Sequence, residues 1–550
     1  MKLVLIQVFR SSFLGRLADQ QHNHSIEIEP IRGTIYDRNN RPLAFNVSVY
    51  SLFANPRMMT VEEKSLASER LSGLLKINPS LINGLLDKDK YFVWIKRKLP
   101  LDVADAIKQE KIRGIGFQQE SKRYYPNASL AAHIIGFANI DNTGLEGLEL
   151  SYNKHLKGTP GRMSVLRDAK MRELMIENGY IPPQHGQQIV LTIDETIQYI
   201  AENALEKAWK KHHAKGAMII VLDVKTGEIL ALANRPTYNL ENASSSSPES
   251  RTNRALNYVY EPGSVFKIVT ASAALETGIF KETDKIFCEN GKYHVAGHIL
   301  HDHVGHGLLT FQEVFEESSN IGVSKIAQKL GADTVYKYAN LFRFGKKTGI
   351  DLMGEVSGNL KPTNRWSKTS IFAIPMGQEV TVTPLQLVCA LSAIANGGTY
   401  MKPFIVKYVK DSNDQILKTF EPQVVDHVIT PETAKRVTEI LVGVVERGTA
   451  TKAQIKGMRV AGKTGTAQKV INGKYSHMSF YATFMGFAPA DNPRLAAIVV
   501  VDEPHPSYFG GTVSAPVFKE VIENSLRYLE NTQGRQSTEE APQKTIHDFM

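Results

Sequence analysis

A serine and a lysine three residues apart stand at the start of a predicted buried helix. Ser264 and Lys267 follow a Pro-Gly pair, and the apolar run 268–275 predicts the helix. Positions i and i+3 share a helix face, so the amine can approach the hydroxyl. A lysine can take the serine's proton when burial or a neighbouring positive charge lowers its pKa. The helix N-terminus would stabilise developing negative charge, so this stretch predicts an acylation site.

The Ser-x-x-Lys pattern alone is weak evidence for chemistry. A second copy, Ser151 to Lys154, lies in a polar setting with no apolar helix behind it. The alternative interpretation of Ser264 and Lys267 is therefore a chance tetrapeptide at an ordinary helix start. Partner groups elsewhere in the chain must decide between the two interpretations.

Ser318 and Asn320 form the first set of partner groups. They lie between two apolar stretches, 311–315 and 323–330, which predict helices joined by a short turn. A second hydroxyl can relay a proton, and an amide side chain can hold a substrate amide. Both functions are needed for acyl transfer from a peptide.

Lys463, Thr464 and Gly465 form the second set of partner groups. They precede two strand-like apolar runs, 480–489 and 496–501, which place the tripeptide on a predicted strand edge. There the lysine offers a cation for a carboxylate and the threonine a hydroxyl that orients it. The glycine would let a substrate backbone come close and pair along the edge.

Both partner patterns recur in this chain, so order and context must select one set. Lys-Thr-Gly also occurs at Lys225, in a predicted hairpin turn, and at Lys347, which opens a loop without a strand. Ser-x-Asn also occurs at Ser151 and Ser357. The ordered set of Ser264-Lys267, Ser318-Asn320 and Lys463-Thr464-Gly465 is a strong signal, although each piece alone is weak.

The chain is long enough for two or more folded units. Residues 26–55 predict a strand, an Asn-rich turn and a strand, and residues 60–120 predict amphipathic helices in a mixed α+β region. A Pro-Pro-Gln-His-Gly sequence ends this part, and beyond it we predict a strand at 188–193 and a helix at 195–211. We therefore expect an N-terminal module over 26–180, a catalytic domain over 181–530 and a disordered polar tail over 531–550.

Composition excludes several classes of function. The net charge of +9 suits an anionic membrane surface or acidic substrates, but no dense basic run indicates nucleic-acid binding. With only Cys288 and Cys389, the chain has no disulfide framework and no cysteine-based zinc site. A histidine-rich segment could suggest a metal, but its Gly-rich setting favours a polar hairpin loop: His294, His298, His301, His303 and His306 with Asp302.

The N-terminal apolar run, Leu3 to Val8, is shorter than a membrane span or the core of a secretory signal. It is similar to the end of a span that meets a basic boundary. We therefore interpret residues 1–25 as the remnant of a membrane anchor and its juxtamembrane segment.

The ordered motifs resemble those of the class B penicillin-binding proteins, the membrane-anchored D,D-transpeptidases that cross-link peptidoglycan. Further segments resemble the family's non-catalytic N-terminal module: Arg32-Gly33-x-x-x-Asp37-Arg38, Arg123 to Pro126, Ala132-His133-x-x-Gly136-Phe137 and Gly144-x-x-Gly147. By composition alone these segments are structural. The stretches 383–387 and 394–398 resemble the region between the family's second and third catalytic motifs.

The resemblance implies an α+β multidomain fold. A mixed α+β pedestal or dimerisation module would precede a penicillin-binding transpeptidase domain, an antiparallel sheet flanked by helices with an all-α subregion. It also implies a role for each site residue. Ser264 would be the nucleophile and Lys267 its base, while Ser318 would relay a proton and Asn320 would hold the substrate amide. The remaining residues would bind the terminal carboxylate or supply oxyanion-hole N–H groups: Lys463, Thr464, Gly465 and Thr466 for binding, and the backbones of Ser264 and Thr466 for the hole.

The resemblance also implies partners and a location. The substrates would be stem peptides ending in D-Ala-D-Ala, β-lactams would be covalent inhibitors, and no cofactor or metal would be needed. A SEDS-type glycan polymerase and other division proteins would be partners. A single-pass anchor would hold the catalytic domain outside the cytoplasm, at the inner membrane. We expect the division type in preference to the elongation type, from the similarity around residues 384–398 and the compact N-terminal module.

Two other functions stay open. A D,D-carboxypeptidase or β-lactamase would use the same acylating residues and pass the acyl group to water. A non-catalytic β-lactam sensor or division scaffold could keep the fold without turnover. The large N-terminal module argues against a stand-alone hydrolase, and the presence of all three motifs argues against a scaffold.

Overall fold

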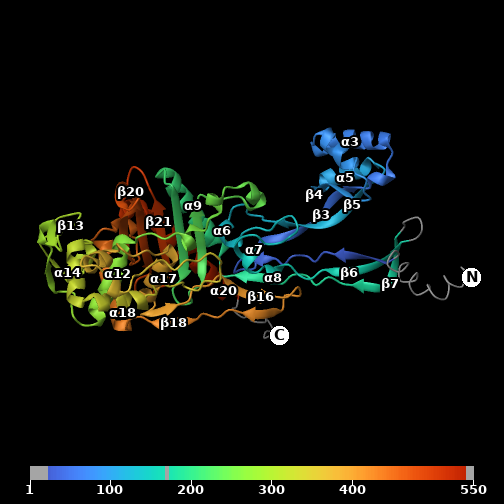
Figure 1. Ribbon diagram of the computed structural model, residues 1–550. Coiled ribbons are helices and arrows are strands. Elements are labelled where there is room, and N and C mark those ends of the chain that lie inside the picture. Colours follow the sequence, from blue (N-terminus) through green and yellow to red (C-terminus); the bar gives the residue numbers. More distant parts are fainter. Residues whose placement is uncertain (1–22, 168–172, 540–550) are drawn as a thin grey trace, which may run out of the picture.

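The computed structural model describes residues 23–167 and 173–539, and it is elongated (Figure 1). One end is a large body that holds α12, α14, α17, α18, β20 and β21. Two N-terminal projections form the other end, a head with α3 and α5 and a strand-rich arm with β6 and β7. This arrangement confirms the predicted mixed α+β, multidomain architecture.

A five-stranded antiparallel sheet lies at the centre of the body, in the order β10-β9-β21-β20-β19. Its strands alternate between two cores, since neighbouring side chains on a strand point to opposite faces. Ile219 and Val221 pack with helices α9 and α20, whereas Met218 and Ile220 join the larger core on the other face. The bounds are β9 Gly216–Asp223, β10 Ile229–Arg235, β19 Ala461–Ile471, β20 Lys474–Ala488, β21 Leu495–Asp502, α9 Glu195–Lys211 and α20 Ala515–Glu539.

The larger core is covered by helices, as predicted for the all-α subregion. Helix α12 is nearly continuous in buried residues, from Lys267 to Leu275, and α17 is buried along its whole length. The helices of this region are α12 Lys267–Glu276, α13 Phe311–Glu316, α14 Asn320–Leu330, α15 Ala332–Leu341, α16 Ser370–Ala373, α17 Pro384–Ala395 and α18 Pro431–Glu446. Short strands and helices connect them: α10 Pro248–Arg251, α11 Arg254–Asn257, β11 Lys285–Phe287, β12 Lys292–Val295, β13 His298–His301, β14 Leu308–Thr310, β15 Thr399–Met401, β18 Val424–His427 and α19 Gly510–Val513.

The base of the N-terminal module shares a sheet with the body. The sheet runs β17-β16-β8-β2-β3-β4, with β5 pairing β3, so strands from both sides of the predicted 180/181 boundary are hydrogen-bonded to one another. The predicted hairpin at 26–55 is β2–β3, whose turn is held by Asp37 Oδ1 accepting from the N–H groups of Asn39 and Arg41. The bounds are β2 Ile35–Tyr36, β3 Pro42–Ala54, β4 Val93–Leu99, β5 Ile115–Tyr124, β8 Gln188–Leu191, β16 Val406–Lys410 and β17 Ile416–Thr419.

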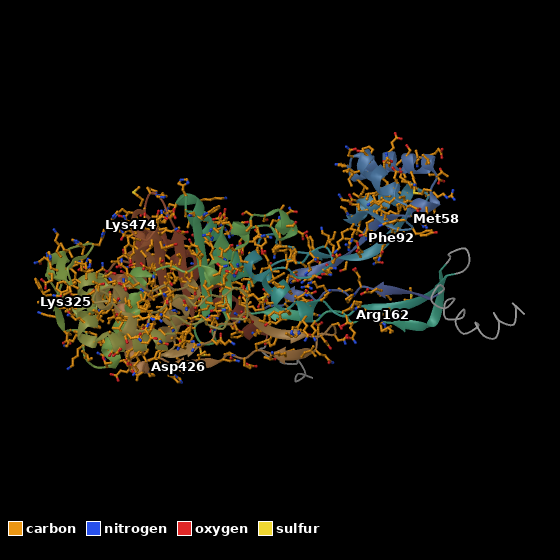
Figure 2. The ribbon with its side chains drawn as sticks, viewed as in Figure 1. Met58, Phe92, Arg162, Lys325, Asp426 and Lys474 are labelled. Carbon is orange, nitrogen blue, oxygen red and sulfur yellow. The ribbon has the colours of Figure 1, made fainter. Side chains whose placement is uncertain are left out.

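The head is formed by residues 50–119 at the far ends of β3 and β5. It contains α3 Val61–Leu75, α4 Pro79–Leu86 and α5 Leu101–Gln109, and it has a hydrophobic core of its own around Leu71, Ile82 and Ile107. Met58 and Phe92 lie on the head, at the opposite end of the molecule from Lys325 (Figure 2). The predicted amphipathic helices in a mixed α+β region are thereby confirmed.

The N-terminal motif residues have structural positions. The buried Glu149 carboxylate accepts from Arg32 Nε at 2.6 Å and from Arg123 Nε at 2.6 Å, so one anion pairs two buried guanidinium groups. The segments around them are α6 Ala132–Ile135, α7 Gly147–Ser151 and α8 Asn153–Leu156. The interpretation of these motifs as structural is therefore confirmed.

The arm is a three-stranded sheet, with β6 between β1 and β7. Its strands are β1 Asn23–Ile28, β6 Gly161–Arg167 and β7 Glu173–Ile181. The interpretation of residues 1–25 as an anchor remnant falls almost wholly outside the described residues. No helix within 23–167 and 173–539 is both long and apolar enough to cross a bilayer.

The C-terminal end departs from the sequence interpretation. Helix α20 continues to Glu539, so residues 531–539 are helical where a disordered tail was predicted. These polar residues can extend a helix that is already packed on the sheet. Adding a residue to an existing helix costs far less free energy than nucleating a new helix. The rest of the predicted tail, 540–550, lies outside the described residues.

Candidate active site

Ser264 lies on a short 3-10 turn, η4 (Gly263–Phe266), that leads directly into α12. The turn packs against the edge strand β19. Gly465 on that strand faces the turn, and a Cβ added there would lie 3.0 Å from Val265 Cγ1 and 3.1 Å from Pro262 O. The sequence interpretation assigned this glycine to close approach of a substrate, but its missing side chain makes room for the serine's own segment.

Lys267 is the first residue of α12, and its side chain is completely buried. Its Nζ donates to Ser318 O at 2.6 Å, to Asn320 Oδ1 at 2.8 Å and to Ser318 Oγ at 3.3 Å. Among the hydrogen bonds of the described residues, none joins this amine to Ser264 Oγ. The amine is therefore oriented by the turn that carries Ser318, one helical turn from the serine it would activate.

Ser318 lies on the turn between α13 and α14, as predicted. Its hydroxyl accepts from Lys463 Nζ at 2.9 Å as well as from Lys267, so it joins two buried amines from distant parts of the chain. Its φ of 58° is in the left-handed region, which costs a non-glycine residue on the order of 1–2 kcal/mol. Such a conformation persists only where neighbouring contacts hold it.

Burial sets the protonation of the two amines. Desolvation lowers the pKa of Lys267 to about 7, and the negative charge of Asp302 opposes this shift. Burial also lowers the pKa of Lys463 well below its ordinary value, and the positive charge of Lys267 lowers it further. The cluster therefore does not readily hold two protonated amines at neutral pH.

Asn320 begins α14, and both ends of its amide are engaged. Its Oδ1 accepts from Lys267, and its Nδ2 donates to His301 O at 3.1 Å. The second hydrogen on Nδ2 and a lone pair on Oδ1 remain for a substrate amide. The structure thus adds a second task for this residue, the orientation of Lys267.

The third motif lies on β19, the edge strand of the central sheet, as predicted. Lys463 is buried and also donates to Thr464 O at 3.3 Å. The Thr464 hydroxyl lies 2.7 Å from Thr449 Oγ1, and Thr466 Oγ1 accepts from Gly510 N at 3.2 Å. Side chains of β19 therefore point alternately to its two faces. Lys463 contacts Ser318 on one face, and Thr464 and Thr466 make these hydroxyl contacts on the other.

Sequence reasoning missed the importance of Asp302, which it grouped with the histidines. Its carboxylate accepts from Ser319 Oγ at 2.6 Å, from Ile321 N at 3.0 Å and from Asn320 N. The histidines lie on the β12–β13 hairpin and the loop after it, as a polar hairpin loop predicts. Within the described chain, no group of three or more His, Cys, Asp or Glu side chains is arranged to hold a metal ion.

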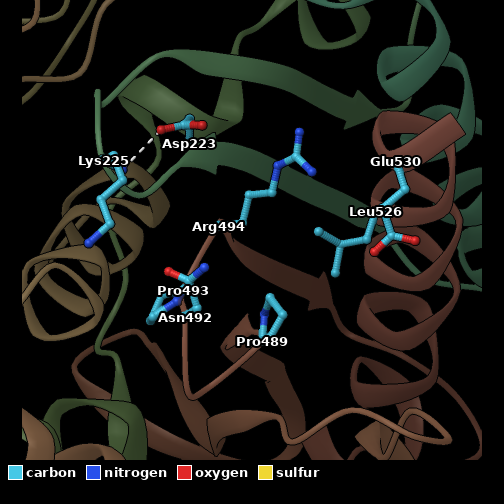
Figure 3. Close-up of a pocket in the computed structure, with 8 residues that line it drawn as sticks. All are labelled: Asp223, Lys225, Pro489, Asn492, Pro493, Arg494, Leu526 and Glu530. Carbon is cyan, nitrogen blue, oxygen red and sulfur yellow. Dashed lines mark hydrogen bonds between the residues drawn. The ribbon is translucent and has the colours of Figure 1, made fainter. Parts of the chain in front are cut away.

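The rejected motif copies do not join the cluster. Ser151 Oγ donates to Gly147 O, one turn earlier in its own helix. Lys225 follows β9 and lines a cavity of about 340 Å³ with Asp223, Arg494 and Glu530 (Figure 3). The Ser264 cluster consists of Ser264, Lys267, Ser318, Asn320 and Lys463. None of these residues lines the cavity, so the size of the cavity is not a guide to the chemistry.

The arrangement has the parts needed for acyl transfer. A neutral Lys267 has two N–H donors and one lone pair. The donors match the two short contacts, to Ser318 O and Asn320 Oδ1, which leaves the lone pair to accept a proton. Lys463 supplies a second amine next to the Ser318 hydroxyl, and β19 offers backbone groups along the edge beside Ser264.

Comparison with known proteins gives matches over nearly the whole chain. A family model described as the penicillin binding protein transpeptidase domain matches residues 217–523, and one described as the penicillin-binding protein dimerisation domain matches residues 27–191. Stage V sporulation protein D of Bacillus subtilis is 38% identical, over 96% of this chain and 83% of the relative. Peptidoglycan D,D-transpeptidase FtsI of Escherichia coli K12 is 34% identical, over 96% of this chain and 89% of the relative.

Solved structures agree with these matches. Penicillin binding protein 3 of Mycobacterium tuberculosis, complexed with aztreonam, aligns with a TM-score of 0.72 at 28% identity, over 92% of this chain and 97% of that one. Penicillin binding protein 2X of Streptococcus thermophilus aligns with a TM-score of 0.76 at 25% identity, over 92% of this chain and 80% of that one. With a dimerisation domain followed by a transpeptidase domain, the chain belongs to the penicillin-binding proteins, in the class B group that its motifs predicted.

Proposed function

We propose that the protein is a serine D,D-transpeptidase of peptidoglycan synthesis. The observation that carries this proposal is the convergence of Lys267 and Lys463 on the Ser318 hydroxyl, beside the turn that holds Ser264. Three segments far apart in the sequence supply a nucleophile, a base of lowered pKa and a second amine, Lys463, which a bound carboxylate would keep protonated. The names of relatives such as FtsI, a peptidoglycan D,D-transpeptidase, support the same activity.

Acylation begins with the neutral Lys267 amine taking the proton of Ser264 Oγ. The serine oxygen attacks the carbonyl carbon of the penultimate D-Ala of a stem peptide. The oxyanion that forms is stabilised by the backbone N–H groups of Ser264 and Thr466, and loss of one such donor typically raises a barrier by ~3 kcal/mol. The peptide C–N bond then breaks, and the terminal D-Ala leaves after its nitrogen receives a proton through Ser318.

Transfer reverses these steps with a different amine. An amine of a neighbouring stem peptide attacks the ester carbonyl, gives its proton to the Ser318–Lys267 pair and forms the cross-link as the Ser264 hydroxyl is restored. Lys463 and Thr464 bind the terminal carboxylate of the donor peptide, with Thr466 beside them, and Asn320 holds the donor's amide. A β-lactam would acylate Ser264 in the same way and remain attached, because its leaving nitrogen stays on the adduct.

The decisive experiment is covalent labelling with a fluorescent penicillin. We expect one adduct, on a peptide containing Ser264, and no adduct in Ser264→Ala with its thermal unfolding unchanged. Labelling of Ser264→Ala at the wild-type rate would sink the assignment. Ser151→Ala is the matched control, since that serine also precedes a lysine by three residues and should label normally.

Adduct lifetime separates transpeptidation from its hydrolytic alternatives. An adduct that lasts for hours supports the transpeptidase, whereas turnover in seconds supports a β-lactamase. Release of D-Ala from a stem pentapeptide, with and without an added acceptor amine, then separates transfer from carboxypeptidase activity. Absence of labelling in a folded wild-type protein would favour the non-catalytic scaffold, whereas a stable adduct without any release of D-Ala from the pentapeptide would favour the sensor.

The cellular setting belongs to the same proposal. We infer a division-type role at the outer side of the inner membrane, with a single-pass anchor, a SEDS-type glycan polymerase and other division proteins as partners. The dimerisation-domain match over 27–191 supports an N-terminal module that contacts other proteins. The domain limits of 26–180 and 181–530 likewise stay predictions. Co-purification of the full-length protein with the polymerase from membranes would test the partnership.

A further inference from the structure

Asp302 connects an exposed loop to the turn that carries Ser318 and Asn320. One carboxylate oxygen, Oδ2, accepts from Ser319 Oγ at 2.6 Å. The other, Oδ1, accepts from the backbone N–H groups of Asn320 and Ile321, the latter at 3.0 Å. A single side chain thus contacts three consecutive residues of the turn.

These contacts complete the start of α14. The first N–H groups of a helix have no partner within it, and a negative charge is stabilising at this end. Ser319 satisfies Gly322 N at 2.9 Å, and Asp302 satisfies the N–H groups of Asn320 and Ile321 from outside the helix. The left-handed conformation of Ser318 is held between these fixed residues and α13.

Asp302 also places a negative charge near Lys267, because its carboxylate accepts from Asn320 N and the Asn320 amide oxygen accepts from Lys267 Nζ. The groups around this amine are Asp302 from the loop after β13, Lys463 from β19, and the uncharged Ser318 and Asn320 from the α13–α14 turn. The amine therefore lies between one acidic and one basic neighbour. Removal of either charge changes the balance that sets its protonation.

The Asp302 loop also contacts the opposite side of the site. The His303 ring packs on Phe509, with centroids 5.1 Å apart. The next residue, Gly510, donates to Thr466 Oγ1 on β19. The loop is therefore fixed both to the helical turn and to the segment beside the third motif, which limits how far Asp302 can move.

We propose that Asp302 is a positioning residue for acylation, which fixes the Ser318–Asn320 turn and holds a negative charge one residue removed from the Lys267 amine, across Asn320. The inference rests on the proposed transpeptidase function. Asp302 itself touches no reacting atom and acts through Asn320, Ser318 and Lys267. Its hydrogen bonds and its charge are separable, and each predicts a different kinetic effect.

The test measures the second-order rate of acylation by a fluorescent penicillin between pH 5.5 and 9. Asp302→Asn retains an oxygen that can accept from the N–H groups of Asn320 and Ile321, and its amide can donate to Ser319 Oγ, so it mainly removes charge. Ser319→Ala keeps the charge and removes two hydrogen bonds, the one that Ser319 Oγ donates to Asp302 and the one that it accepts from Gly322 N. Glu317→Gln is the matched control, because it removes a neighbouring exposed carboxylate whose contact is with His306.

We expect Asp302→Asn to move the rising limb of the pH profile to lower pH by about 0.5 unit or more, since loss of a nearby anion disfavours the protonated amine. Ser319→Ala should leave the limb in place and lower the plateau at least about fivefold, since it loses two hydrogen bonds and loss of one alone typically costs about 1 kcal/mol. Glu317→Gln should match the wild type in both respects. A merely structural role for Asp302 would change the plateau without moving the limb.

A wild-type limb in a folded Asp302→Asn protein, or a limb moved to higher pH, would overturn the proposal. If Asp302→Asn does not fold, Ser319→Ala decides, and a wild-type plateau in that variant overturns it. Absence of any labelling in the wild type would instead refute the transpeptidase function on which the inference rests. The two failures are therefore distinguishable in one set of measurements.

Discussion

Two buried amines meet at one serine hydroxyl, and this arrangement allows one amine to carry a proton while the other stays neutral. The amines of Lys267 and Lys463 both lie within hydrogen-bond distance of Ser318 Oγ, and burial lowers the pKa of each. A bound substrate carboxylate would favour the proton on Lys463, because that residue lies on the strand edge at which we propose that the carboxylate binds. The positive charge retained there would then keep Lys267 neutral and able to accept a proton.

The pH dependence of acylation follows from this arrangement. As the proposed base, Lys267 must be neutral to take the proton of Ser264, and its pKa is lowered to about 7. The neutral fraction rises tenfold per pH unit below that value and levels off above it, so the acylation rate should rise from pH 5.5 and reach a plateau near pH 8. Stopped-flow labelling, with thermal unfolding measured at each pH, checks this. A flat profile over the same range would mean that another group is the base.

Asp302 shows where residue-level prediction from sequence ends. Ser264, Lys267, Ser318 and Lys463 could be found because their motifs follow one another in order and each lies in a fitting local context, a helix start, a turn or a strand. Asp302 has no such signal, because its contacts are with a turn 17 to 19 residues later and depend on how a hairpin loop folds back. Its neighbouring histidines supplied a misleading metal pattern as well.

At the scale of elements, the site depends on the fit between η4 and β19. The strand carries Lys463 and Thr466, and the turn carries Ser264, so their spacing sets the distance between the nucleophile and the substrate-binding groups. Gly465 allows this spacing, since a Cβ there would be closer to Val265 and Pro262 than ordinary packing permits.

Gly465→Ala should therefore impair acylation. The added methyl would push β19 away from the turn by a few tenths of an ångström, and misplacement on the order of 1 Å can cost about 100-fold in rate. We expect labelling at least tenfold slower, with overpacking destabilising the fold by about 1–3 kcal/mol.

Gly73→Ala is the control for the same chemical change. Gly73 lies in α3 with open space around its Cβ position, so alanine should leave labelling unchanged and stabilise the head by about 1 kcal/mol. Wild-type labelling kinetics in Gly465→Ala would show that the strand and the turn need no such close contact.

The elements themselves were largely predictable. Helix α9 begins and ends at the predicted residues, and the strands of the central sheet follow the apolar runs closely, because long periodic segments bury a continuous face. The pairing of β16 with β8 and of β8 with β2 was not predictable, since strand partners far apart in sequence leave no local pattern. The sequence likewise gave no sign that α20 would continue beyond residue 530.

In the whole molecule, the segments that share a hydrophobic core are expected to fold as one unit. The base of the N-terminal module shares the large core with the body, with Ile35, Leu43 and Ile134 packed in the same cluster as α12 and α17. The Arg32–Glu149–Arg123 network is buried in that base. By contrast, the head keeps its buried residues between Leu52 and Ile107 in a separate cluster. The base and the body should therefore unfold as one unit, and the head should form another.

Removal of the head should consequently leave the acylation site intact. Val49 and Glu120 are directly paired on β3 and β5, so an Asn-Gly turn can join them in place of residues 50–119. The cut removes the whole separate core, and Glu120, which loses Arg97, becomes exposed to water. We expect penicillin labelling within about twofold of the full chain, since no residue of the Ser264 cluster contacts the head, and we expect the calorimetric transition of the body to persist. Loss of both labelling and that transition in the shortened chain would show that head and body fold cooperatively despite their separate cores.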